Sequence, residues 1–247
     1  MNETAARSSL DWLVVGGGLH GVHLATRLIG EAEVDPTRLR ILDPEEDLLG
    51  RWRALTAVTG MSHLRSPGVH HLDLEPFSLI HLAGNRRCRT RGLLRTRYEC
   101  PALDLFNVHC DGVLERFGLR QLHLRDSAAH IEPGPSSVRV TTGAGELLET
   151  RRVILAIGQD ALPTWPTWAP RDEPRIRHIF DRLPGCPSST CGGGARRILV
   201  VGGGISAAQV ALRLVGGGHA VTLLMRHALR IHRFDSDPGW LGPRLMP

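Results

Sequence analysis

The sequence predicts an α/β protein, and three observations support this prediction. Two apolar segments, residues 10–15 and 198–201, each stop at a glycine-rich turn, as buried parallel strands do. Each turn is followed by apolar residues at helical spacing and then by another short apolar run. Between these two units, strand-like runs are separated by Pro, Gly and Ser, which is the pattern of an antiparallel meander.

Composition excludes several classes of protein. The chain has 247 residues, of which 42% are hydrophobic and 22% charged, enough to build a buried core. Its longest uncharged runs, 12–26 and 198–212, have 15 residues each. A membrane span needs ~20 mainly apolar residues, so we expect a globular protein with no membrane partner.

All 30 basic residues are arginine, and the net charge is +5. Two explanations fit this bias: a general compositional preference, or the use of guanidinium groups to bind phosphate. The arginines are spread along the chain, whereas a nucleic-acid surface needs a clustered basic patch. We therefore expect no nucleic-acid partner, while anionic cofactors fit the mild positive charge.

The first unit contains the fingerprint Gly16-x-Gly18-x-x-Gly21, with Leu19 and His20 in the turn. In such a turn the first glycine makes the bend from strand to helix, and the second admits a pyrophosphate to the backbone N–H groups. The third lets the helix pack closely on the sheet. The free N–H groups and the dipole of the helix then favour an anion at its N-terminus. We expect a dinucleotide cofactor at this turn.

The residues after this turn complete the motif. Apolar residues at 22–29 predict a helix, for which Gly30 is the expected C-terminal cap. A second strand is expected at 39–42, and Asp43 follows it directly. A carboxylate at this place accepts hydrogen bonds from an adenosine ribose.

The second unit has the fingerprint Gly202-x-Gly204-x-x-Ala207, with Ile205 and Ser206 in the turn. After its next strand the chain carries Arg226 where the first unit has an acid, which favours a 2′-phosphate and therefore NADP over NAD. The alternative is that this arginine only ends a solvated strand.

The middle of the chain is less regular. Residues 50–98 are rich in Arg, Gly, Pro and His and are expected to be irregular, and residues 101–117 read as a helix. The apolar face of that helix is expected to hold Leu103, Phe106, Val108, Cys110, Val113, Leu114 and Phe117. Strands are expected at 119–124, 138–142, 147–150 and 153–157.

Two dinucleotide motifs with a meander between them resemble the flavoproteins that bind FAD at the first motif and NAD(P)H at the second. Ala156-Ile157-Gly158 is similar to the short glycine-ended motif at the crossing between their domains, and Ala128 matches a position whose backbone meets the adenine. Within this architecture the chain resembles the flavin-dependent N-hydroxylating monooxygenases, the lysine and ornithine N-hydroxylases, and related FAD/NAD(P)-binding proteins.

Three further segments carry this resemblance. Gly50-Arg51-Trp52 is similar to the Gly-x-Trp after the ribose acid, and 60–67 to the segment that passes the flavin ring. Residues 234–243 resemble a stretch after the NADPH strand in uncharacterised relatives. The resemblance implies that Trp52, Met61, Ser62, His63 and Arg65 line the flavin, although an ordinary packed loop is the alternative.

Together these features predict three regions: a three-layer, Rossmann-like FAD-binding domain at 1–160, a Pro/Gly-rich crossing segment at 161–195, and a partial NADP-binding βαβ unit at 196–247. In the resembling proteins the chain continues beyond this point and returns to the FAD domain. We therefore expect that the C-terminal part is missing, and that another copy or a partner chain covers the incomplete sheet.

The expected function is that of an oxidoreductase in which NADPH reduces FAD and the reduced flavin activates oxygen to oxygenate a small, amine-like molecule. Two alternatives stay open: a pyridine-nucleotide-dependent reductase, and a flavin-binding module without turnover. No catalytic acid or base can be assigned.

Cysteine and histidine give no further chemistry. Five cysteines do not make a disulfide framework, and the N-terminus lacks an apolar signal core, so a cytoplasmic location is expected. Cys186 and Cys191 have the spacing of a redox pair but lie in the Pro/Gly-rich segment, which favours ordinary loop cysteines. No metal motif is present among the 13 histidines, and no metal site is expected.

Overall fold

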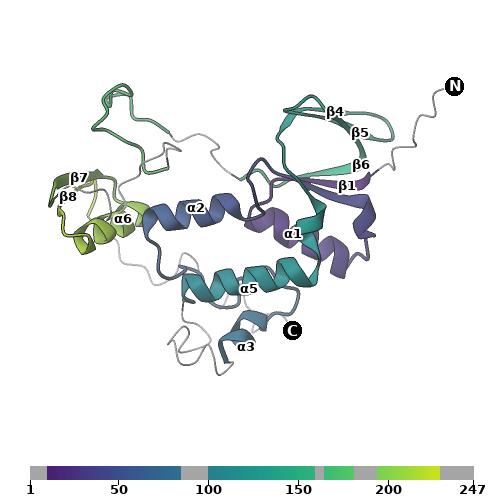
Figure 1. Cartoon of the computed structure of the whole chain (residues 1–247), viewed down its shortest axis with the longest axis horizontal. Coiled ribbons are helices and arrows are strands. Elements are labelled where there is room, and N and C mark those ends of the chain that lie inside the picture. The colour runs from purple at the N-terminus through teal and green to yellow at the C-terminus, as the bar shows by residue number, and fades with distance from the viewer. Residues whose placement is uncertain (1–9, 85–99, 159–163, 181–193, 229–247) are drawn as a thin grey trace.

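The computed structural model describes residues 10–84, 100–158, 164–180 and 194–228 (Figure 1). These residues form a six-stranded sheet and a separate two-stranded sheet. The elements, in chain order, are β1 (Leu10–Val15), α1 (Leu19–Gly30), η1 (Pro36–Arg38), β2 (Leu39–Leu42), α2 (Gly50–Thr59), α3 (Ser78–Gly84), α5 (Leu103–Arg116), η2 (Leu119–Leu122), β3 (His123–Leu124), β4 (Ala128–Pro133), β5 (Val138–Thr142), β6 (Leu147–Leu155), β7 (Arg197–Val201), α6 (Ile205–Gly216) and β8 (Ala220–Leu224).

The large sheet has the strand order β3-β2-β1-β6-β5-β4. Strand β1 lies inside it, parallel to β2 on one side and to β6 on the other, so that Val14 is paired with both Ile41 and Ile154. Strands β4, β5 and β6 form an antiparallel meander that continues from the parallel part through β6. The carboxyl ends of β1 and β2 therefore meet at one edge, where a nucleotide binds in open α/β sheets.

The first part of the chain is a three-layer structure. Side chains alternate along β1, so that Val14 faces a core formed with the helices, while Leu13 and Val15 face a second core. That second core includes Val140 of the meander. Figure 1 shows β4 and β5 on one side of β1 and β6, with α1 and α5 on the other. The predicted α/β fold with a Rossmann-like, three-layer unit is confirmed.

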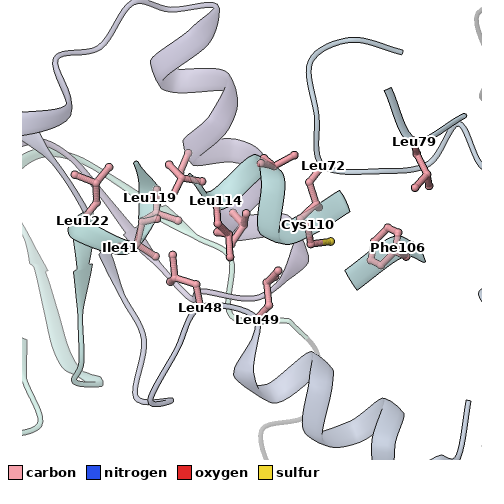
Figure 2. Packing of buried hydrophobic residues seen from close by; sticks show 14 of the residues in the cluster. Ile41, Leu48, Leu49, Leu72, Leu79, Phe106, Cys110, Leu114, Leu119 and Leu122 are labelled. Carbon is pink, nitrogen blue, oxygen red and sulfur yellow. The ribbon is translucent and has the colours of Figure 1, made fainter. Parts of the chain in front are cut away.

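The helix-side core is built around α5. Phe106, Cys110 and Leu114 are buried and lie with Leu48 and Leu49 in the cluster drawn in Figure 2. The expected face was wrong at Val108, which is 56% exposed, and it omitted the buried Leu105 and His109. The helical periodicity fixes the spacing of the face, but its exact orientation depends on α3 and the loop before it, which sequence alone does not place.

Polar contacts also hold α5 to α3 and to the segment before it. Asp73 is buried and accepts a hydrogen bond from the Arg116 guanidinium, and Ser78 Oγ lies 2.7 Å from His109 Nε2. Burial, together with the neighbouring His71 ring, lowers the pKa of His109 to about 4. This imidazole is therefore neutral in the folded protein at neutral pH.

Three strand assignments differ from expectation. Residues 147–150 and 153–157 were expected as separate strands, but β6 runs through Leu147–Leu155 without a break. Residues 119–124 do not belong to the meander, because η2 occupies 119–122 and β3 pairs in parallel with β2. The first meander strand is β4, Ala128–Pro133. Its side chains are mostly exposed and it ends in proline, so it lacks the apolar alternation that signals a strand.

The expectation of an irregular 50–98 segment was wrong at 50–59 and 78–84, whereas 60–77 contain no helix or strand, as expected. Helix α2 occupies Gly50–Thr59 and α3 occupies Ser78–Gly84, while 85–99 lie outside the described residues. The α2 sequence has few large apolar residues, so it shows little helical periodicity.

Gly30 is not the C-terminal cap of α1, because Glu31 occupies that position. A Cβ on Gly30 would lie 2.3 Å from a Leu74 methyl and 3.0 Å from the Phe117 ring. This glycine therefore allows close packing of the helix end rather than a left-handed turn.

The second unit is smaller. Strands β7 and β8 are parallel neighbours joined by α6, as the sequence predicts. Outward-facing Leu199, Val201 and Leu224 are 58%, 50% and 53% exposed. The single helix α6 covers one face of this two-stranded sheet. The other face therefore presents apolar side chains to solvent.

Two features are absent from the described residues. No helix among them is long and apolar enough to cross a membrane. No group of three or more His, Cys, Asp or Glu side chains within the described ranges is arranged to hold a metal ion.

Candidate nucleotide-binding sites

The first glycine turn lies where β1 meets α1, against the ends of β2 and β6. Gly16 has φ +109° and donates its N–H to Leu42 O at 2.8 Å. A Cβ at Gly16 would lie 2.4 Å from Ala156 O, so a side chain there would clash with the backbone after β6. From the sequence, Ala156 was expected only in a crossing motif, whereas its backbone also supports the glycine turn.

Gly18 and Gly21 have different surroundings. A Cβ on Gly18 would meet no heavy atom within 4 Å, and this residue is the N-cap of α1 without a side-chain cap bond. A Cβ on Gly21 would lie 1.8 Å from Gly16 O. The turn therefore packs tightly on its inner side and is open at Gly18, beside the helix N-terminus. An open backbone surface at this point fits a pyrophosphate.

Asp43 lies at the end of β2 and contacts the turn directly. Its Oδ2 accepts the Gly17 N–H at 2.6 Å, and its Oδ1 accepts the Glu45 N–H at 2.9 Å. His123 Nε2 lies 3.0 Å from the Asp43 backbone oxygen. The carboxylate is half-buried, and each of its oxygens has further acceptor capacity for a ribose hydroxyl.

Leu48 and Leu49 support the turn at Gly17, and neither was expected there from the sequence. A Cβ on Gly17 would lie 2.7 Å from a Leu48 methyl. Leu49 has φ +64° and donates its N–H to Gly17 O at 2.8 Å. A buried leucine in the left-handed region is uncommon, and no pattern in the sequence predicts this conformation.

The segment expected at the flavin ring follows α2 and is held by the residues before α5. Leu64 N–H donates to Pro101 O, and Leu103 N–H donates to Ser62 O, each at 2.9 Å. Ser62 and His63 are exposed, and Ser62 Oγ lies 3.1 Å from His63 Nδ1. The segment therefore presents two linked polar side chains to solvent from an ordered backbone.

Met61, Arg65 and Trp52, also expected at the flavin, are partly buried. Met61 packs against the helix-side core. The Trp52 indole packs edge-on against Phe106 at 5.8 Å, and its Nε1 donates to Asn107 Oδ1 at 3.3 Å. These Trp52 contacts join α2 to α5.

The second glycine turn repeats the first in outline. Gly202 has φ +140° and donates its N–H to Leu224 O at 2.9 Å. Gly204 is the N-cap of α6, and a Cβ there would meet nothing within 4 Å. Within the turn, Ile205 is exposed and Ser206 half-buried. The turn therefore has the same open point beside a helix N-terminus.

Three other expected positions lie outside these turns. Ala128 begins β4 and packs on the meander-side core, next to a break in the strand register. Gly158 follows β6 with φ +71° and is exposed. Arg226 is exposed two residues after β8. The structure thus brings Gly16, Gly18, Gly21 and Asp43 together at one turn, and Gly202, Gly204 and Ala207 at another.

Comparison with protein families identifies the chain. The family model of L-lysine 6-monooxygenase/L-ornithine 5-monooxygenase matches residues 106–237, more than half of the sequence. The chain belongs to this lysine/ornithine monooxygenase family. No curated protein matches the sequence.

Solved structures similar to this family member include a flavin monooxygenase mutant from Stenotrophomonas maltophilia, with 19% identity and a TM-score of 0.62 over 93% of this chain and 61% of that one. A bacillithiol disulfide reductase from Bacillus cereus has 16% identity and a TM-score of 0.62 over 96% and 63%. The protein OTEMO, in complex with FAD and NADP, has 15% identity and a TM-score of 0.61 over 88% and 39%. These likenesses confirm the fold, and the chain spans less than two thirds of each neighbour.

Proposed function

We propose that this lysine/ornithine monooxygenase family member is an FAD- and NADPH-dependent oxidoreductase that oxygenates a small nucleophilic molecule, such as an amine. The observation that carries the proposal is the family match, which falls on a chain with two open glycine turns. FAD, when bound, supplies hydride acceptance and oxygen activation, and the protein supplies binding and orientation.

We assign FAD to the first turn. Gly18 leaves room for the pyrophosphate at the N-terminus of α1, and Asp43 holds Gly17 while it offers its oxygens to the ribose. Ala128 and Gly158 are proposed contacts for the rest of the nucleotide. Ser62 and His63 project from the segment after α2 and are the proposed polar neighbours of the flavin.

We assign NADPH to the second turn. Gly202, Gly204, Ile205, Ser206 and Ala207 provide the backbone site at the N-terminus of α6. The exposed Arg226 after β8 provides a guanidinium for the 2′-phosphate, where a carboxylate would select NADH.

One form of the reductase alternative passes electrons through a dithiol, and the described cysteines do not provide one. Cys100 and Cys110 are not in a disulfide, and burial raises the pKa of Cys110 to about 12, so it is not a nucleophile at neutral pH. Cys186 and Cys191 lie outside the described residues. The family match favours the monooxygenase reaction, which is the function we propose.

The location and the association state are part of the proposal. We propose a cytoplasmic protein, based on the odd number of cysteines, which does not suit a disulfide framework. We also propose that the exposed apolar face of β7 and β8, formed by Leu199, Val201 and Leu224, is covered by a second copy or a partner chain.

The test is anaerobic mixing of the FAD-loaded protein with NADPH or NADH in a stopped-flow instrument. Rapid bleaching of the flavin by NADPH, with hydrogen peroxide formed when air is admitted without substrate, supports the proposal. The absence of saturable FAD binding would refute it. Bound FAD that neither nucleotide bleaches would leave a flavin-binding module without turnover.

A further inference from the structure

Helix α2 lies between the two nucleotide-binding units, and contacts from outside hold both of its ends. At its start, Leu49 N–H donates to Gly17 O in the first glycine turn, at 2.8 Å. At its end lies the side chain of Arg213, which belongs to α6 of the second unit. With ten residues, α2 spans ~15 Å between these two contacts.

The Arg213 contact satisfies the end of α2 chemically. The last four carbonyl groups of a helix have no partner within it. Gly60 and Met61 N–H groups donate to carbonyls of the last turn, at 3.2 and 3.1 Å. Arg213 Nη1 adds hydrogen bonds to Ala57 O at 2.8 Å and to Val58 O at 2.5 Å. A cation at this end also interacts favourably with the helix dipole.

Gly60 is shaped to receive this arginine. It has φ +69°, a left-handed conformation that glycine adopts without strain. A Cβ at this position would lie 2.8 Å from Arg213 Cδ and 3.1 Å from its Cβ and Cγ. The aliphatic part of the arginine therefore lies directly on the glycine, and a side chain at position 60 would displace it.

The contact joins the two open turns through a continuous path. Arg213 is in the last turn of α6, and Gly204 is the N-cap at the other end of the same helix. From Gly17 the path runs along α2, across Arg213 and along α6 to Gly204. Figure 1 shows α6 next to the end of α2, away from the six-stranded sheet.

We propose that Arg213 is a positioning residue that fixes the second nucleotide-binding unit on α2, so that the nicotinamide is presented to the flavin in one orientation. This inference rests on the proposed function. The flavin-side segment, 60–67, begins two residues after Val58, whose carbonyl Arg213 holds. The same contact therefore sets both the unit that carries NADPH and the start of the segment proposed to face the flavin.

The contact itself is tested by hydrogen exchange on the full FAD-loaded chain. Arg213→Ala is expected to raise the exchange of amides in 56–64 at least fivefold, while peptides from β1 and α1 stay unchanged. Arg213→Lys keeps a cation and several donors. The exchange of these amides in Arg213→Lys is expected to lie between that of wild type and that of Arg213→Ala. Arg197→Ala is the matched control, because Arg197 is an exposed arginine of the same unit, on β7.

The role in positioning is tested by the rate of flavin reduction at saturating NADPH. Arg213→Ala is expected to lower the limiting rate at least tenfold, with the dissociation constants of FAD and NADPH changed less than threefold. Arg213→Lys is expected to recover part of the rate. Gly60→Ala displaces the arginine from the other side, so it should lower the rate similarly, and the double variant should be no slower than the worse single one.

The outcomes separate this inference from the proposed function. A limiting rate for Arg213→Ala within twofold of wild type overturns it, as does a loss of rate that parallels an equal loss of FAD affinity. If NADPH does not bleach the wild-type flavin, the proposed function fails and the positioning role fails with it. The exchange measurement still decides whether the contact exists, because unchanged exchange at 56–64 refutes it.

Discussion

The open point at Gly18 allows the cofactor assignment to be tested without disturbing the fold. Gly18 has φ −75° and ψ −172°, which any residue adopts, and a Cβ there would meet no heavy atom within 4 Å. Gly18→Ala should therefore leave the stability of the cofactor-free protein within ~0.5 kcal/mol of wild type. The added methyl group would occupy the surface at which we place the pyrophosphate.

The magnitude follows from the hydrogen bonds that the methyl group displaces. A hydrogen bond to a charged group contributes about 1.5–3 kcal/mol, so the loss of one or two weakens FAD binding on the order of 100-fold. At a FAD concentration 100 times the wild-type dissociation constant, binding stabilises wild type by about 2.7 kcal/mol. The variant would gain only ~0.4 kcal/mol at that concentration.

Thermal unfolding with and without FAD measures this difference. For a chain of this size, 1 kcal/mol corresponds to about 2–4 °C, so FAD should raise the Tm of wild type by roughly 5–11 °C and that of Gly18→Ala by ~1 °C. Gly21→Ala is the contrasting variant, because its Cβ would lie 1.8 Å from Gly16 O. It should lower the Tm without FAD as well. A full FAD shift in Gly18→Ala would show that no pyrophosphate lies there.

Three further predictions concern single side chains. Asp43→Ala should weaken FAD binding by about 1.5–3 kcal/mol in a fluorescence titration, while Asp47→Ala, at an exposed acid four residues later, should not. Arg226→Asp should reduce the preference for NADPH over NADH at least tenfold in stopped-flow reduction. If NADPH and NADH reduce the wild-type flavin at equal rates, Arg226 does not select between them. The pKa of His109 is lowered to about 4 from 6.5, so the unfolded chain binds the additional proton between these values, and stability should fall as pH falls through that window, by up to about 3 kcal/mol. In His109→Gln, the free energy of unfolding, measured with urea from pH 7 to 4, should fall less steeply with falling pH. An unchanged pH dependence would contradict the lowered pKa of His109.

The glycine turns could be predicted from sequence because their determinants are local. A strand, a turn and a helix that follow one another bring Gly16, Gly18 and Gly21 together whatever the rest of the chain does. Asp43 joins them because β2 lies parallel to β1, and parallel neighbours end at the same edge. For the same reason, the order of strand, turn and helix puts Gly202 and Gly204 at the start of α6.

The surroundings of these turns could not be predicted, because they depend on contacts between distant segments. Leu49 adopts a left-handed conformation that leucine rarely takes, and in this conformation its N–H donates to Gly17 O in the distant glycine turn. Trp52 was selected as a flavin neighbour, yet its indole packs against α5, and nothing in the local sequence gives that direction. The Arg213 contact joins residues about 155 positions apart, beyond any periodicity or motif.

The two fingerprints differ at their third position, and the structure explains the difference. In the first unit, a Cβ on Gly21 would collide with Gly16 O, because α1 lies close to the turn. In the second, Ala207 occupies the matching position, and its Cβ lies 3.2 Å from where a Gly202 Cβ would be. The six-stranded sheet has both faces covered, whereas the two-stranded sheet exposes one. The third residue of each fingerprint, Gly21 or Ala207, therefore depends on how closely the helix approaches its turn. Gly18 and Gly204 are the open positions, at which a substitution tests nucleotide binding itself.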